Sequence, residues 1–139
     1  MANPFRCTII TPSAAVFDGD VTYANLPAHD GMRGVMAGQS PLLTALGIGT
    51  LRIDLLKGGS ERYFIDGGFA QVMEGSLKII TERALVPDQI SAKDADAELK
   101  EANAAAVSGG TDRRKAEAAQ QRARVQLALA RSAPAAAER

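Results

Sequence analysis

The sequence is poor in the residues that build disulfides, zinc sites and aromatic platforms. Its 139 residues include one cysteine, one histidine and no tryptophan, and aromatic residues make up only 4% of the chain. A single cysteine cannot form an internal disulfide, so the chain fits a reducing compartment. Cys7 and His29 together cannot supply the four ligands of a structural zinc site, and we expect neither a metal nor another cofactor. The scarcity of aromatic residues predicts a core of Val, Ile and Leu.

Charge of one sign and long apolar runs are also lacking. Lys plus Arg and Asp plus Glu each number 16, so the formal net charge is zero. This balance does not indicate a nucleic-acid-binding protein. No stretch approaches the roughly 20 apolar residues that span a bilayer, and the first residues lack the pattern of a signal peptide. We therefore expect no nucleic-acid partner, and a chain that meets a membrane only through its partners.

The composition changes sharply near Asp88. Eleven of the 13 glycines lie before position 76 and five of the six prolines before position 88, whereas 17 alanines follow Ile90. Gly and Pro separate short strands, and Ala is the best helix former. The sequence therefore predicts two units: an all-β sandwich over residues 1–87 and an α-helical hairpin over residues 88–139.

The first unit shows repeated strand signals. Apolar and polar residues alternate over Leu51–Leu55, and a Gly58-Gly59 turn followed by Arg62–Ile65 completes a predicted hairpin. We interpret Asp18-Gly19-Asp20 and Gly47-Ile48-Gly49 as further tight turns. Strands of about five residues with turns every 8–12 residues are typical of a sandwich or barrel, and about eight to ten short strands fit this segment.

The second unit is expected to form helices at about residues 91–107 and 112–131, followed by a frayed tail over 132–139. Ser91 is the expected N-cap of the first helix. The link between the helices is short, so they must run antiparallel. Apolar residues at spacings of three and four predict the seam, with Ala92, Ala95, Leu99, Ala102 and Ala106 facing Ala116, Ala119, Ala123, Leu127 and Ala130.

The two predicted helices carry opposite net charge. Residues 92–106 contain two basic and four acidic side chains, and residues 112–131 contain six basic and two acidic ones. Opposite charges favour pairing of the helices, and the positive excess leaves the second helix able to meet an acidic surface. An ordinary solvated face on a soluble hairpin accounts for the same charges equally well.

Sites for catalysis or nucleotide binding do not emerge. Neither Gly31–Gly34 nor Gly47–Gly49 is followed by the Lys-Ser/Thr and helix of a phosphate-binding loop. Asp18 and Asp20 lack the Glu that completes an EF-hand. The sequence therefore predicts a non-catalytic protein. Two competing interpretations are a stand-alone β-sandwich that binds a ligand and oligomerises through its helices, and a small enzyme that uses Asp and Glu.

Two segments resemble the epsilon subunit of bacterial F-type ATP synthases, which is called delta in mitochondria. The segment from Asp30 to Ile53, DGMRGVMAGQSPLLTALGIGTLRI, is similar to that family's Gly-rich signature followed by Pro-Leu-Leu-Thr. The segment from Phe64 to Val72 is similar to its Gly-Gly-Phe motif. The resemblance covers nearly the whole chain. It implies a sandwich of about ten short strands followed by two antiparallel helices, in a non-catalytic rotor subunit that couples the c ring to the gamma subunit.

The resemblance also implies contact residues. A mobile surface loop against the c ring is expected at His29, Asp30, Gly31, Met32 and Arg33. The gamma contact is assigned to Gln39, Pro41, Leu42 and Leu43. Because neighbouring strand residues point to opposite faces, one of the two leucines is available to gamma; the alternative is that both are core residues across a bend at Pro41. Such a protein lies at the cytoplasmic face of the bacterial inner membrane as a peripheral subunit.

In many bacterial members the helical hairpin extends along gamma and inhibits ATP hydrolysis. Because of the positive excess of the second helix, we expect its basic face to dock near acidic helices of the catalytic β subunits in the α/β head. This face is assigned to Arg113, Arg114, Lys115, Arg122 and Arg124. Some members bind ATP through an Ile/Leu-Asp-x-x-Arg-Ala motif at the first helix. Ser91 and Asp94 stand here where that motif has Asp and Arg, so we expect no ATP binding.

Overall fold

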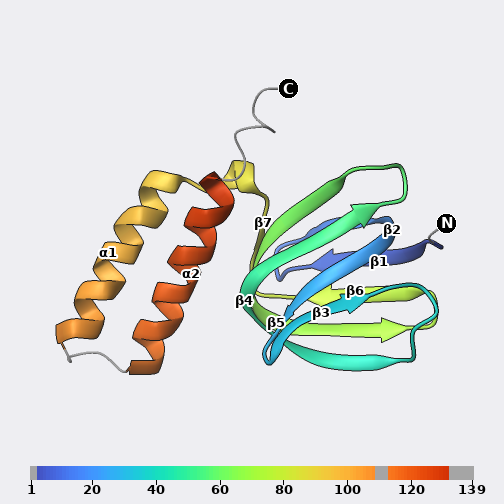
Figure 1. Cartoon of the computed structure of the whole chain (residues 1–139), viewed down its shortest axis with the longest axis horizontal. Coiled ribbons are helices and arrows are strands. Elements are labelled where there is room, and N and C mark those ends of the chain that lie inside the picture. Colours follow the sequence, from blue (N-terminus) through green and yellow to red (C-terminus); the bar gives the residue numbers. More distant parts are fainter. Residues whose placement is uncertain (1–2, 109–112, 132–139) are drawn as a thin grey trace. The chain divides into compact units, whose positions relative to one another are not determined.

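The computed structural model describes residues 3–108 and 113–131, which divide between Ala84 and Leu85 into two compact units (Figure 1). The expected tail and the link between the helices lie outside the described residues. In chain order the elements are β1 (Phe5–Ile10), β2 (Ala15–Ala28), β3 (Gly31–Val35), β4 (Leu42–Leu55), β5 (Ser60–Met73), β6 (Ser76–Ile80), β7 (Ala84–Leu85), the 3₁₀ helix η1 (Pro87–Gln89), α1 (Ala92–Ser108) and α2 (Arg113–Arg131).

The strands form one sheet that folds back on itself. Neighbouring strands follow the order β1-β6-β5-β4-β2-β3, and β1 also pairs with β2, which closes the ring. Strands β1 and β6 are parallel, whereas the pairs along the rest of this order are antiparallel. Strand β3 lies at the free edge of β2, and the short β7 pairs with β5. The predicted fold class, a β-sandwich followed by a helical hairpin, is confirmed.

The strands are fewer and longer than predicted. Seven strands occur in the described residues, and β2, β4 and β5 each contain 14 residues. The predicted turns at Asp18-Gly19-Asp20 and Gly47-Ile48-Gly49 are wrong, because these residues lie inside β2 and β4. Register shifts bend β2 between Val21 and Tyr23 and again after Asn25. A bulge increases twist without ending the ladder, so one strand serves both layers of the sandwich.

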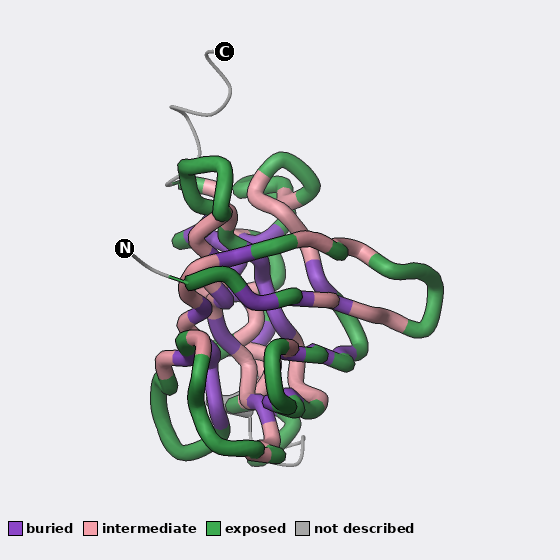
Figure 2. The backbone as a smooth tube through the Cα atoms, turned by 90° about the vertical axis from the view of Figure 1, so that its right-hand side faces the viewer, coloured by how far each residue is buried: buried purple, intermediate pink, exposed green. Residues whose placement is uncertain are grey.

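The core of the sandwich is aliphatic, as predicted. Buried residues alternate with less buried ones along β1 and β6. Figure 2 shows the buried segments inside the strands and the exposed ones in the connecting loops. Fully buried side chains come from β1, β2, β4, β5 and β6, and they include Ile9, Val21, Leu26, Leu51, Ile53, Ile65, Leu77 and Ile79, with Phe64 as the one fully buried aromatic ring. Alternation of this kind places a second set of side chains on the outside of the same strands.

Cys7 lies in the middle of β1 and is completely buried. Burial raises the pKa of its thiol from 9.0 to about 12, and the thiolate is the reactive form. We therefore expect the folded chain to resist a disulfide reagent such as DTNB at pH 8, while the chain in guanidinium chloride reacts at once. Because the folded-state pKa is raised, the unfolded chain releases the proton first, so this thiol lowers the free energy of unfolding as the pH rises above about 9. Fast labelling of the folded chain would contradict the assignment of Cys7 to a closed core.

The two helices form an antiparallel hairpin within the second unit (Figure 1). The predicted N-cap is confirmed, because the Asp94 amide donates to the Ser91 hydroxyl oxygen at 3.2 Å. The predicted seam is confirmed in part, since Ala95, Ala102, Ala116, Ala123 and Leu127 are buried, whereas Ala92 in the first turn is exposed. Gln126 and Leu129 are also buried, although the predicted stripe does not contain them.

Candidate interaction surfaces

The residues predicted as contact sites lie in the β2–β3 hairpin, in the segment that leads into β4 and the start of that strand, and on α2. No group of three or more His, Cys, Asp or Glu residues within the described part of the chain is arranged to hold a metal ion. None of the described helices is long and apolar enough to cross a membrane. The residues predicted as contact sites therefore have to be judged by their exposure, their hydrogen bonds and the strands that position them.

The predicted c-ring residues lie together at the tip of the β2–β3 hairpin. His29 and Asp30 form the turn, and Ala28 pairs with Gly31, whose φ of 131° suits glycine. All five predicted residues, His29 to Arg33, are exposed. The expected surface loop is confined to the turn at His29 and Asp30, because Gly31–Val35 forms strand β3. The His29 amide donates to the Ala45 carbonyl of β4 at 3.0 Å, which ties the tip to the sandwich.

Gln39 belongs to a tight loop between β3 and β4. Its side-chain oxygen accepts a hydrogen bond from the Met36 amide at 2.6 Å. The side chain is exposed, and one of the two lone pairs on its oxygen serves the loop itself. Gln39 therefore shapes the approach to β4 and keeps its NH₂ group and the second lone pair for a partner.

The structure decides between the two predictions for Leu42 and Leu43. The Leu42 side chain is half-buried, whereas Leu43 is 67% exposed, so the alternative that both belong to the core is wrong. Leu42 pairs with Val72 and Leu43 with Gln71 on β5. Together with Pro41 and Met73 these residues line a surface depression of about 250 Å³.

Leu43 is one corner of a larger apolar surface, which we call the outer face. Phe69, Met73 and Ile80 are each about half exposed, at 56%, 49% and 51%. Directly opposed residues in a sheet share one face, and the register pairs Leu43 with Gln71, Phe69 with Ile80, and Gln71 with Lys78. The outer face therefore consists of Leu43 from β4, Phe69, Gln71 and Met73 from β5, and Lys78 and Ile80 from β6.

The sequence prediction included only Leu43 of this surface. Over Phe69–Met73 the buried positions, Ala70 and Val72, alternate with exposed ones, and two of the three exposed positions carry large apolar side chains. A strand that is apolar on both sides has two surfaces to cover. That pattern was the available signal, although it does not distinguish a contact surface from a core packed on both sides.

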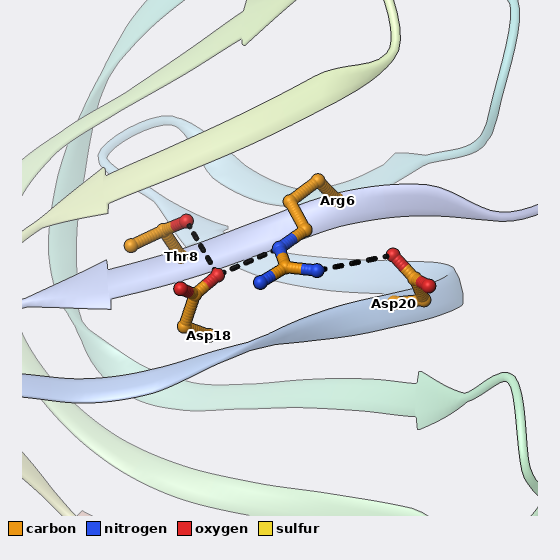
Figure 3. A network of polar contacts seen from close by, with 4 residues as sticks. All are labelled: Arg6, Thr8, Asp18 and Asp20. Atoms are coloured by element: carbon orange, nitrogen blue, oxygen red, sulfur yellow. Dashed lines mark hydrogen bonds and ion pairs between the residues drawn. The ribbon is translucent and has the colours of Figure 1, made fainter.

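A charged network borders the outer face on strands β1 and β2 (Figure 3). The Arg6 guanidinium donates to Asp18 at 2.7 Å and lies 3.7 Å from Asp20, while the Thr8 hydroxyl donates to Asp18 at 3.4 Å. These residues are opposed across the β1–β2 ladder. The hydrogen bond from Arg6 lowers the pKa of the Asp18 carboxyl below its ordinary value. Arg6 therefore binds both carboxylates on the exposed side of β1 and β2, and the three side chains together carry one net negative charge.

The basic residues of α2 do not share one face of the helix. Lys115 and Arg122 line a cavity of about 280 Å³ between the helices, together with Glu98 and Glu101 of α1. At about 100° per residue, Arg113 and Arg124 lie on the opposite side of α2 from this cavity. The prediction of a single basic face is therefore wrong in the folded hairpin. The seam also contains a polar pair, since the Gln120 amide group donates to the Asn103 side-chain oxygen at 2.7 Å.

Comparison with known proteins identifies the family that has this architecture. Residues 4–87 match the family described as ATP synthase, Delta/Epsilon chain, beta-sandwich domain. Curated relatives include the ATP synthase epsilon chains of Rhodopirellula baltica, 37% identical over 91% of this chain and 98% of the relative, and of Rippkaea orientalis, 38% identical over 88% and 93%. A chain in the structure of the Euglena gracilis mitochondrial ATP synthase, which contains OSCP, F1 and the c-ring, superposes with a TM-score of 0.80 at 25% identity, over 90% of this chain and 80% of that one. The chain therefore belongs to the ATP synthase delta/epsilon chain family.

Proposed function

We propose that this chain is a non-catalytic rotor subunit in the central stalk of an F-type ATP synthase. The observation that carries the proposal is the outer face, a group of large apolar side chains left uncovered on a sandwich of this family. Exposed apolar patches rimmed by polar residues mark surfaces that another protein covers. A subunit that works through contacts needs such surfaces and requires no catalytic group of its own.

The outer face is the proposed gamma contact. Pro41, Leu42 and Leu43 lie at its β4 end, where the depression beside Met73 can receive a side chain from the partner. Gln39 shapes the loop that leads into this strand. Phe69 and Ile80 extend the contact across β5 and β6. Aromatic and Met side chains are enriched in the buried centre of protein interfaces, which agrees with this composition.

The tip of the β2–β3 hairpin is the proposed c-ring contact. It presents an acid, a base and an exposed thioether in Asp30, Arg33 and Met32. The backbone bond from His29 to β4 holds the tip at a fixed position, which a part that transmits torque requires. Through these contacts the chain is held, as a peripheral subunit, at the cytoplasmic face of a bacterial inner membrane.

Affinity purification from membrane extracts tests the proposal. A tagged copy of the full chain, expressed in its own host, is expected to retrieve gamma, the c ring and the α/β head in fixed ratio. A tagged chain that elutes alone from solubilised membranes would contradict the rotor assignment and would favour a free-standing module.

We further propose that the helical hairpin regulates ATP hydrolysis. The buried side chains of its seam are mostly alanine, and a cavity remains between the helices, so the folded hairpin buries little apolar surface. Arg122 is half-buried beside that cavity, so separation of the helices would expose it further, whereas Arg113, Arg114, Lys115 and Arg124 are already exposed. The opened helix would then present basic residues all round to acidic segments of the catalytic head.

Removal of the residues after Ile90 is expected to raise the ATPase activity of the assembled enzyme several-fold, because the inhibitory contact is lost. The measurement is the steady-state ATPase rate of purified complexes that retain the truncated subunit. A matched control ends the chain after Arg131 and keeps both helices. Equal rates for the two truncations would show that the hairpin does not inhibit hydrolysis.

A further inference from the structure

Lys78 is the charged residue of the outer face, and it lies on the side of that face that adjoins β1. It lies on β6, where Gln71 of β5 opposes it on one side and Thr8 of β1 on the other. Ile80 follows two positions along the same strand and shares its orientation. We propose that the subunit covering this face presents a carboxylate to Lys78, and that this pair determines how the partner is oriented on the sheet. The inference rests on the proposed function of the face as the gamma contact.

The charges around Lys78 are already committed to other partners. Thr8 separates it from Asp18, and Asp18 is bound by Arg6. Asp20 also lies beside Arg6. Within residues 3–108 and 113–131 Lys78 takes part in no ion pair, and its side chain is exposed. It is therefore the one unneutralised charge on the outer face as described.

A partner that covers the neighbouring side chains also removes water from Lys78. Lys78 opposes Gln71, which lies between Phe69 and Met73, and Ile80 follows Lys78 on the same side of β6, so a partner that covers these three apolar side chains also covers part of Lys78. Burying an ammonium group without an opposite charge is costly, and the cost is offset only when a carboxylate and further hydrogen bonds replace the water. With Gln71 and Ile80 covered, the Lys78 head group keeps access to water only on the β1 side, whereas a lysine that stands clear of a contact keeps it all round.

The expected partner surface is therefore apolar and carries one Asp or Glu. The apolar part matches Leu43, Phe69, Met73 and Ile80, and the carboxylate matches Lys78 with Gln71 as a second donor. Such a pair contributes specificity, because a partner docked in another register would leave both charges buried without partners.

Titration calorimetry with the full chain and the gamma subunit of the same enzyme tests the inference. Lys78→Met removes the charge but keeps the length of the side chain. If gamma supplies a carboxylate, Lys78→Met leaves that group buried alone and weakens binding by about 30-fold or more, and Lys78→Glu weakens it further. If gamma supplies none, Lys78→Met binds as tightly as the unaltered chain or more tightly, which overturns the inference. Lys57→Met, in the turn between β4 and β5, is the matched control and is expected to leave the affinity unchanged.

A third variant separates failure of the inference from failure of the proposed function. Phe69→Ser disrupts the apolar part of the face without adding a charge beside Lys78. Weakened binding in Phe69→Ser together with unchanged binding in both Lys78 variants would keep the face as the gamma contact and remove the carboxylate. Unchanged binding in all three variants would remove the face itself.

Discussion

Replacement of Gly68 by alanine is expected to lower the free energy of unfolding of the sandwich by roughly 3–5 kcal/mol, which combines the cost of backbone strain with that of overpacking. Gly68 lies in β5 at the bend that begins at Gly67, and its φ is 106°, where residues with a side chain are strained. A Cβ atom there would overlap the carbonyl oxygen of Ile80 and lie 2.8 Å from the Cα of Thr81. Both obstacles are backbone of the neighbouring segment, so they cannot move aside as a side chain would.

Chemical denaturation monitored by circular dichroism measures this loss. Gly75→Ala is the matched control, because Gly75 has a φ of 77° but no atom within 4 Å of the added Cβ. Only the backbone cost of about 1–2 kcal/mol applies there. An equal loss for the two variants would show that the close approach of β5 to Ile80 is not present in solution. Domains have total stabilities of about 5–15 kcal/mol, so Gly68→Ala leaves the sandwich marginal.

Replacement of Phe69 by aspartate is expected to weaken binding to gamma by at least about 100-fold, because it places a charge at the centre of an apolar contact. The Phe69 side chain is 56% exposed in the chain alone, so the substitution removes little of the core. The same calorimetric titration provides the affinity, and thermal unfolding of the variant checks that the sandwich remains folded.

Leu56→Asp is the matched control for this substitution. Leu56 is also about half exposed, at 50%, but it lies in the turn between β4 and β5, away from the outer face. Its replacement is expected to leave the affinity for gamma unchanged. If both aspartate variants weaken binding equally, the effect comes from charge or stability in general, and the outer face is not the contact.

Much of the architecture was predictable because it depends on local chemistry. Gly and Pro interrupt strands and Ala favours helices, so the composition change near Asp88 separated the β unit from the helical one. Ser91 caps α1 through a hydrogen bond to a residue three positions away, which the sequence shows directly. Gly58-Gly59 forms the expected turn, with positive φ at both residues.

The predictions for glycine were wrong where a glycine makes room for a distant segment and does not form a turn. Gly58 lies in a turn, whereas Gly49 lies inside β4 because a Cβ atom there would meet the Pro27 ring of β2 at 2.6 Å. Gly68 lies inside β5 because Ile80 approaches it. A glycine that makes room for a distant segment has the same sequence signal as one that reverses the chain. The strand count and the turns at Asp18–Asp20 and Gly47–Gly49 were therefore wrong.

The sequence by itself determined the two units, the aliphatic core and the family, because composition, spacing and motifs are properties of neighbouring residues. Only the tertiary structure decided which apolar residues stay outside. Phe69 and Val72 are both large apolar residues of one strand, yet closure of the sheet buries Val72 and leaves Phe69 uncovered. The tertiary structure also turned Lys115 and Arg122 toward α1, and it left Lys78 without an ion pair among the described residues. Exposure and pairing depend on which distant strands and helices come together, and that information is absent from any short stretch of sequence.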